Sequence, residues 1–291
     1  MDVFIQNFTL HDSLYQATLI FYGLATLLFL GEIVLCRVWK NKIMRYFSSF
    51  VFLTALIVQL IWFFRLWHVA GRAPIRTRYE SLILYCICVG IVYLFVEILF
   101  NIRIIGLLSS FACFAILVYA TINRDLELVK LPPALQSGWF VPHVVAYFFA
   151  YGSLTVASFC AFLYIIKPSL EISKPKGLVF RQGGETASLN FEEVSYEIIR
   201  FGFTMLTFGL ILGSVWAKFA WGTYWGWDPK ENWALVTWLI YMTYLHLRYI
   251  PAWKGRMGAI FVVLGYLAIM FTYLGMKYLP TAKSSLHVYQ G

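Results

Sequence analysis

Residues 81–100 read SLILYCICVGIVYLFVEILF, twenty consecutive positions in which Glu97 is the single charged residue. A helix needs about 20 apolar residues to cross about 30 Å of hydrocarbon. In lipid such a segment has to be helical, because the bilayer core offers no water to the backbone N–H and C=O groups. Residues 81–100 therefore predict a membrane-spanning helix, and the number of similar runs predicts the fold.

Eight runs of this kind follow one another along the chain. They cover residues 17–35, 47–64, 81–100, 104–122, 142–166, 198–215, 229–249 and 257–276. The expected fold class is an all-α, polytopic membrane helix bundle. The sequence shows no internal repeat and no segment with the composition of a separate domain. We therefore expect a single membrane domain over residues 1–291. The first run has no Lys or Arg before it and no small-residue cleavage site after it, which favours a retained helix over a signal peptide.

Composition supports the same class. Apolar residues make up 61% of the 291 residues and charged residues 13%, against about 45–50% and about 25% in soluble domains. A water-soluble enzyme, a disordered tail and a disulfide-stapled secreted module are excluded. The net charge of +9 belongs to loops, so we expect no nucleic-acid partner. The five cysteines lie in or beside apolar runs, as small core residues do.

Basic residues in the loops predict the orientation of the chain in the membrane. The N-terminal tail has none, whereas the loop after the first run holds four: Arg37, Lys40, Lys42 and Arg45. The positive-inside rule then places both termini outside, although the basic second loop reduces the bias. Residues 167–195, which are rich in Pro and Gly, become a cytoplasmic connector, and residues 216–232 become an outer loop. Glu32 and Glu97 lie near the inner ends of the first and third runs, so we expect each to reach the interface or to pair with a neighbour, with Arg37 and Arg103 as candidates.

Tryptophan is concentrated in one segment. Six of the eleven tryptophans fall between Trp216 and Trp238, and the centre reads WGTYWGWDPKE over residues 221–231. Asp228 suits an N-cap, Pro229 the first helical position and Glu231 the third, so we expect a helix to begin at Pro229. The aromatic run before this cap favours a large planar ligand such as haem or a quinone. The alternative is an interfacial aromatic belt, but a belt spreads tryptophan over all helix ends.

Histidine indicates where such a ligand could bind through iron. His246 lies about 26 Å below the start of the helix that begins at Pro229, at a rise of ~1.5 Å per residue, and therefore near the inner end. His143 opens the fifth run on the outer side, and His287 follows the last run. The alternatives are an interfacial His246 beside Arg248 and ordinary exposed rings at the other two positions. The remaining histidines, His11 and His68, are expected to be structural or solvated.

These residues together resemble a known family. The segments VWA (215–217), WGTYWGWDPKE (221–231) and LHLR (245–248) are similar to the tryptophan-rich "WWD" segment of haem-handling proteins, and most similar to the CcsA/ResC family of System II cytochrome c synthases. Segments 71–74 (GRAP), 79–81 (YES), 135–139 (LQSGW) and 285–289 (SLHVY) agree. The likeness covers most of the chain from about residue 60. Two departures are Lys218-Phe219, where the family often has Asn-Glu, and a more basic second loop.

The resemblance implies roles for the site residues. His143 and His287 would be the catalytic pair and the axial iron ligands of an outer haem b, held against a loop that contains the cofactor-binding residues. Those residues are Trp221, Gly222, Trp225, Trp227, Asp228 and Glu231. His246 would ligate haem within the membrane, opposite a ligand from a CcsB/ResB-type partner subunit. The other partners implied are apocytochrome c and membrane lipid.

The implied activity is that of a haem lyase subunit, which moves haem outward and supports its thioether attachment to a Cys-x-x-Cys-His apocytochrome. The implied location is a bacterial inner membrane with the active face outside, or a thylakoid membrane. Two other functions stay open at this point. One is a haem carrier without ligation activity; the other is a membrane scaffold that binds no haem, whose tryptophans are only anchors.

Overall fold

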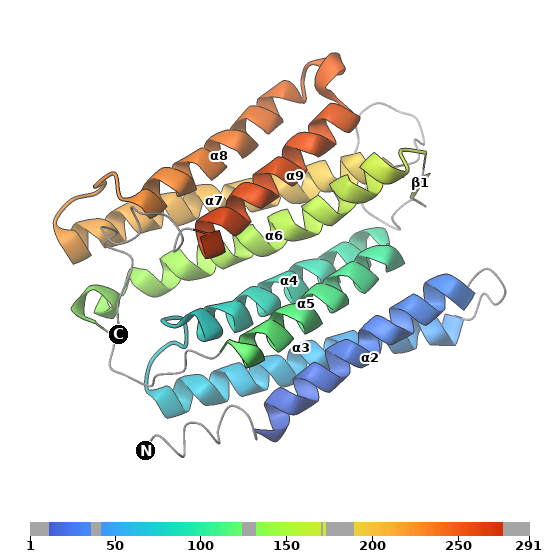
Figure 1. The fold of residues 1–291 in the computed structure, drawn as a ribbon, viewed down its shortest axis with the longest axis horizontal. Helices are drawn as coiled ribbons and strands as arrows, with labels where there is room; N and C mark the ends of the chain where they lie inside the picture. The colour runs from blue at the N-terminus through green and yellow to red at the C-terminus, as the bar shows by residue number, and fades with distance from the viewer. Residues whose placement is uncertain (1–11, 36–41, 124–131, 170, 173–188, 276–291) are drawn as a thin grey trace. The chain divides into compact units, whose positions relative to one another are not determined.

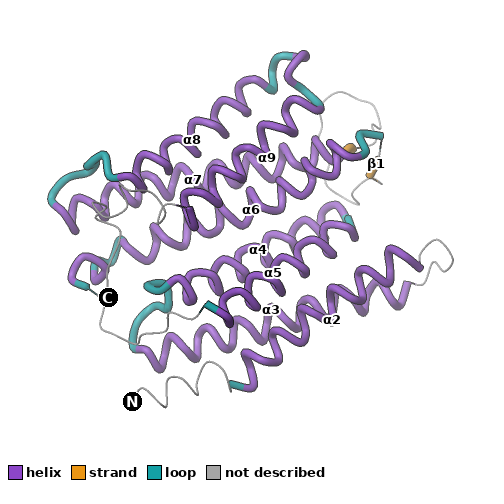
Figure 2. Tube along the Cα trace, viewed as in Figure 1, coloured by secondary structure: helices purple, strands orange, loops and turns teal. Residues whose placement is uncertain are grey.

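The computed structural model describes residues 12–35, 42–123, 132–169, 171–172 and 189–275. In these ranges the eight predicted spans are all helical, and extended backbone is confined to two short paired strands, so the all-α prediction is confirmed. The elements are α2 (Ser13–Leu35), α3 (Lys42–Ala70), α4 (Arg78–Phe100), α5 (Arg103–Ile122), η1 (Pro133–Gln136), α6 (Phe140–Ile166), β1 (Glu171–Ile172), β2 (Leu189–Asn190), α7 (Phe191–Trp221), α8 (Pro229–Leu247), η2 (Pro251–Trp253), α9 (Arg256–Met270) and the π-turn η3 (Phe271–Gly275). Figures 1 and 2 show their order and type.

Seven of these helices are long and apolar enough to cross a membrane, so the chain is an integral membrane protein. The eighth predicted span, helix α8, is not among these seven, because its first turn is the polar Pro-Lys-Glu-Asn sequence. Its start is as predicted: Asp228 caps Pro229 at the first helical position, and Glu231 completes a capping box.

Helix α7 is longer at both ends than the span predicted from residues 198–215. It begins at Phe191, where Asn190 and Glu193 form a capping box, and it continues to Trp221. The last part of the expected 167–195 connector and the first part of the expected 216–232 loop are therefore helical, which corrects both boundaries. The predicted span ends where the sequence becomes polar. A helix, however, keeps its backbone hydrogen bonds after it leaves the hydrocarbon.

The contacts of the chain group its helices into two compact units, although the lack of an internal repeat had favoured one domain. Unit 1 holds α2 to α5, and unit 2 holds α6 to α9 together with the short helices and strands. In each unit the first helix packs on both the second and the last, and the successive helices of a unit run antiparallel (Figure 1).

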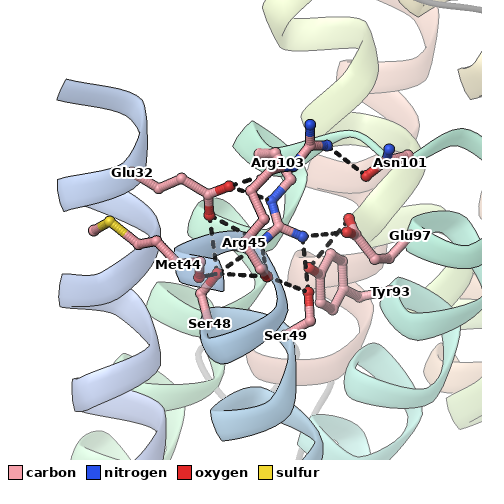
Figure 3. A network of polar contacts seen from close by, with 9 residues as sticks. All are labelled: Glu32, Met44, Arg45, Ser48, Ser49, Tyr93, Glu97, Asn101 and Arg103. Atoms are coloured by element: carbon pink, nitrogen blue, oxygen red, sulfur yellow. Dashed lines mark hydrogen bonds and ion pairs between the residues drawn. The ribbon is translucent and has the colours of Figure 1, made fainter. Parts of the chain in front are cut away.

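A buried ion-pair network joins the four helices of unit 1 (Figure 3). Arg103, at the start of α5, bonds both oxygens of Glu32 from α2 at 2.9 Å and pairs with Glu97 from α4. The same guanidinium bonds Ser48 and Ser49 of α3 at 2.6 and 2.7 Å. The expectation that Glu32 and Glu97 pair with Arg103 is confirmed, whereas Arg37 lies outside the described residues.

The basic second loop of unit 1 is organised around Glu80. Arg72 bonds both carboxylate oxygens of Glu80 at 3.0 Å, and Glu80 also accepts the backbone N–H groups of Arg76 and Thr77. Glu80 is fully buried and the Arg72 side chain is 9% exposed. A bidentate Arg–carboxylate pair constrains the geometry of both side chains as well as neutralising their charges. The Arg72–Glu80 pair therefore holds the conformation of the loop.

Candidate functional site

His143 lies in the first turn of α6 and is held against α7. Its Nδ1 is 2.9 Å from the carbonyl oxygen of Gly209. Because a carbonyl only accepts hydrogen bonds, this contact puts the proton on Nδ1 and the lone pair on Nε2. The ring stacks on Trp216 with centroids 5.6 Å apart and planes 18° apart, and Tyr147 meets it edge-on at 4.9 Å.

Gly213 makes room for that ring. A Cβ atom at Gly213 would lie 2.5 Å from Cε1 of His143 and 2.7 Å from its Nδ1, well inside van der Waals contact. The imidazole can therefore lie flat on α7 because position 213 has no side chain. Gly213 was not predicted as a site residue, although its spacing of four from Gly209 matches the small residues that line close helix contacts in membranes.

Trp216 connects His143 to the aromatic segment. It is 1% exposed, its indole donates to the Ala134 carbonyl of η1 at 2.8 Å, and its ring contacts Trp221 at 4.7 Å. His143, Trp216 and Trp221 thus form one continuous series of rings. The end of unit 2 that carries this series, where α6 and α8 begin and α7 ends, is called the His143 end below.

Lys218 and Gly222 make the turn from α7 into the aromatic loop, residues 222–228. Gly222 ends the helix with φ +84°, a left-handed value that favours glycine. The Lys218 amine donates to the Gly222 carbonyl at 2.8 Å and lies 5.5 Å from the centre of the Tyr224 ring. Lys218 is one of the two departures from the family pattern, and here it caps the helix.

The aromatic loop holds Trp227 in an uncommon conformation. Its φ is +57°, which costs a bulky residue about 1–3 kcal/mol and persists only where neighbours enforce it. Glu231 holds this conformation, because its carboxylate accepts hydrogen bonds from the N–H groups of Gly226 at 2.9 Å and Asp228 at 3.0 Å. Asn232 donates to the Trp227 carbonyl at 3.0 Å. Asp228 is 5% exposed and accepts the backbone N–H of Lys230 at 2.8 Å, so Asp228 caps α8 while Glu231 holds the loop backbone.

The rings of the aromatic loop are open to a ligand. Trp227 is 69% exposed and Tyr224 is 59% exposed, and Trp225 meets Trp227 edge-on at 5.9 Å. The indole N–H of Trp225 is buried and has no acceptor among the residues that the structure describes. Exposed aromatic faces beside an unused donor fit a flat ring system with polar groups on its edge, as haem has.

The π-turn η3, which follows α9, packs on the first part of α8. Phe271 contacts Trp233 of α8 at 4.4 Å, and the Thr272 hydroxyl lies 3.5 Å from the Trp233 carbonyl. The segment that follows η3 therefore starts at the His143 end of unit 2. His287 lies in that segment, outside the described residues, so its approach to His143 stays a prediction.

His246 lies at the opposite end of unit 2, called the His246 end below. It is exposed in the last turn of α8, and its Nδ1 is 2.8 Å from the Met242 carbonyl, which again leaves the lone pair on Nε2. Arg248, two residues later, pairs with Glu192 in the first turn of α7. Along α7, Glu192, the partner of Arg248, and Gly209, the partner of His143, are about 26 Å apart at a rise of ~1.5 Å per residue.

The remaining histidine candidates add nothing to this pair. His68 is exposed in the last turn of α3 in unit 1, as expected, and His11 lies outside the described residues. Within the described ranges the side chains form no cluster of three or more His, Cys, Asp or Glu that could hold a bare metal ion. Iron bound within a porphyrin needs only one or two such ligands.

Known proteins show the family of the chain. The family described as "Cytochrome C assembly protein" matches residues 75–282. Among curated proteins, "Cytochrome c biogenesis protein CcsA" of Prochlorococcus marinus (strain MIT 9515) is 34% identical over 304 residues, covering 96% of this chain and 94% of its own. The proteins of the same name from Porphyra purpurea and Guillardia theta are 34% and 36% identical, each over 77% of this chain and 80% and 78% of their own.

A solved structure shares the fold. "Cytochrome c Heme Lyase CcmF" superposes with a TM-score of 0.67 and 16% sequence identity, over 89% of this chain. The chain spans 46% of the length of that protein. At this identity the likeness concerns the arrangement of helices alone.

Proposed function

The chain belongs to the CcsA family of cytochrome c assembly proteins, and from that premise we propose that it moves haem b between two histidine sites and supports its covalent attachment to apocytochrome c. In this proposal His246 ligates haem near the inner face. His143 and His287 ligate it near the outer face, against the aromatic loop. The membrane is a bacterial inner membrane or a thylakoid membrane, with the His143 end outside.

One observation carries the proposal: two imidazoles lie at opposite ends of unit 2, and each donates Nδ1–H to a backbone carbonyl. A backbone bond at one ring nitrogen orients the other nitrogen and raises its basicity toward a metal. The described residues of unit 2 offer no second imidazole near His246, which agrees with a second ligand from a CcsB/ResB-type partner.

The chemistry at the outer site is an addition of thiols to alkenes. Each cysteine S–H of a Cys-x-x-Cys-His segment adds across one haem vinyl group, so that sulfur bonds one carbon and hydrogen the other. The histidine of that segment replaces one of the two axial imidazoles. The chain contributes position: His143 is fixed by Gly209 and Trp216, and the aromatic loop holds the edge of the ring.

Histidine variants test the proposal. His143→Ala and His287→Ala should abolish most cytochrome c maturation, when the chain is expressed with its partner and an apocytochrome and scored by haem stain. His246→Ala should lower bound haem at both sites, because it acts upstream. His68→Ala, an exposed histidine of unit 1, is the control and should leave both readouts unchanged.

The outcomes separate the alternatives. Wild-type haem content and maturation in both His143→Ala and His287→Ala would remove the outer site. Haem content that depends on these histidines, with no maturation by the wild-type complex, would favour a carrier without ligation activity. An absence of any bound haem in the purified wild-type complex would favour a membrane scaffold.

A further inference from the structure

Tyr196 of α7 lies between two arginines at the His246 end of unit 2. The guanidinium carbon of Arg248 is 4.4 Å from the centre of its ring, and that of Arg200 is 5.8 Å away. Arg248 pairs with Glu192 and Arg200 pairs with Glu197. The two cations share one aromatic ring, so they lie at the same level of unit 2, beside the last turn of α8.

The two arginines differ in what they can still bind. The Arg248 side chain is 13% exposed and is committed to Glu192. The Arg200 side chain is 57% exposed, and only its Nη1 is engaged, at 3.0 and 3.3 Å from the two oxygens of Glu197. Its Nε and Nη2 have no bond to any residue that the structure describes. An exposed pair of this kind contributes little to stability, so Arg200 can exchange Glu197 for another carboxylate.

His246 lies next to this layer, and an aromatic pair lies one step further along the same seam. Arg248 follows His246 by two residues on α8. Toward the His143 end, Trp238 of α8 packs on Phe203 of α7 at 5.4 Å and donates to the Thr207 hydroxyl at 2.9 Å. Arg200, Arg248 and His246 therefore lie at the His246 end of unit 2, and the apolar aromatic pair lies next to them toward the His143 end.

This combination of a cation, an imidazole and an apolar aromatic pair suits haem, which has two carboxylates on one edge, iron at the centre and an apolar opposite edge. We propose that Arg200 binds the propionate carboxylates of the haem whose iron His246 ligates. The inference rests on the proposed function. A guanidinium fork is suited to a carboxylate, which it can meet with two parallel hydrogen bonds. Lipid phosphate offers the same oxyanion chemistry, so the experiment has to separate the two sources.

The experiment titrates the purified full-length chain in detergent with haem b and with iron protoporphyrin IX dimethyl ester, whose propionates carry no charge. The variants are Arg200→Gln, Arg200→Lys and His246→Ala. Arg256→Gln is the matched control, because Arg256 lies at the same end of unit 2 but bonds the Ile165 carbonyl of α6. Thermal unfolding of each variant checks that the fold is kept.

We expect Arg200→Gln to weaken the His246-dependent haem binding by about tenfold, which is the loss of one charge-assisted contact. Lysine should restore part of it, since it keeps the charge without the fork. The ester should bind wild-type chain about tenfold more weakly than haem, and Arg200→Gln should weaken it no further. Arg256→Gln should bind haem as the wild type does.

Two results would overturn the inference while the proposed function stands. One is unchanged haem affinity in Arg200→Gln. The other is an equal loss for haem and ester in that variant, which would assign Arg200 to a lipid headgroup or to the fold. If His246→Ala lost no haem, the inner site of the proposed function would fail, and this inference with it.

Discussion

At the scale of single residues, the imidazole of His143 depends on the absence of a side chain at Gly213. An alanine there would put a methyl group 2.5 Å from the ring. Alanine is favoured over glycine in a helix by about 1 kcal/mol, but overpacking a close contact costs about 1–3 kcal/mol. The cost of overpacking therefore exceeds the gain in helix propensity. The His143 ring, rather than the helix backbone, is the group that can move to relieve it.

We therefore predict that Gly213→Ala leaves the fold intact and displaces His143, which lowers haem bound at the outer site severalfold. Gly138→Ala is the control, since a Cβ atom there meets nothing within 4 Å. Absorption spectra of the purified complex, titrated with haem, measure the effect. Equal spectra for the two alanine variants would show that His143 does not need the room at position 213.

Local sequence patterns indicated His143 and the aromatic segment, but neither Gly213 nor the contacts among these residues. Asp228, Pro229 and Glu231 predicted the start of α8 because a cap is decided by a few adjacent residues. The stacking of His143 on Trp216 joins residues far apart in the chain, and no local pattern encodes it. The bond from Lys218 to Gly222 was missed for another reason: a lysine near the end of a helix has many possible partners.

At the scale of helices, unit 1 is held by Arg103. Its guanidinium is the shared partner of Glu32 and Glu97, whose side chains are 3% and 12% exposed. Removing one partner of a buried ion pair leaves an uncompensated charge, which costs about 3–5 kcal/mol. Arg45, whose side chain is 41% exposed, approaches Glu32 at 3.7 Å and contributes less.

We predict that Arg103→Met lowers the free energy of unfolding by about 3–5 kcal/mol, and that Arg45→Met lowers it by about 0–1 kcal/mol. Thermal or denaturant unfolding of the purified chain in detergent measures both. The triple variant Glu32→Gln, Glu97→Gln, Arg103→Met should recover much of the loss, because no charge is then left unpaired. A similar small loss for both arginines would mean that water reaches the carboxylates.

Helix limits show how far a sequence pattern extends. The starts of α4 and α5 lie within three residues of the predicted spans, because an apolar run and the membrane end together there. Helix α7 exceeds its predicted span at both ends, since Asn190 and Glu193 cap it within polar sequence and Trp216 is part of its buried face. An apolar run predicts which residues lie in the hydrocarbon, whereas capping residues predict where the helix itself begins and ends.

At the scale of the whole molecule, the proposed route for haem requires the two ends of unit 2 to lie on opposite sides of the membrane. Loop charges predict that the His143 end is outside. Two exposed positions report the two ends without touching the histidines: Gly138, before α6, and Ala252, in η2.

We predict that a cysteine at position 138 reacts with a membrane-impermeant maleimide added to intact cells, and that a cysteine at position 252 reacts only after the membrane is permeabilised. Cys36 is first replaced by serine, since it lies outside the described residues, while the other four cysteines are buried. Labelling of both positions from the same side would contradict the two-site route. Labelling with the sides exchanged would reverse the orientation and the direction of transport.

The left-handed backbone conformation of Trp227 affects how fast and how selectively the outer site binds a ligand. Glu231 and Asn232 impose its conformation while the chain folds, so the exposed indole is already fixed when a ligand arrives. The entropy of ordering the loop is then part of folding rather than of association. Such preorganisation should make the outer site rigid and selective for flat molecules, and a loop relaxed at Asn232 should accept a wider range of porphyrins with lower affinity for each.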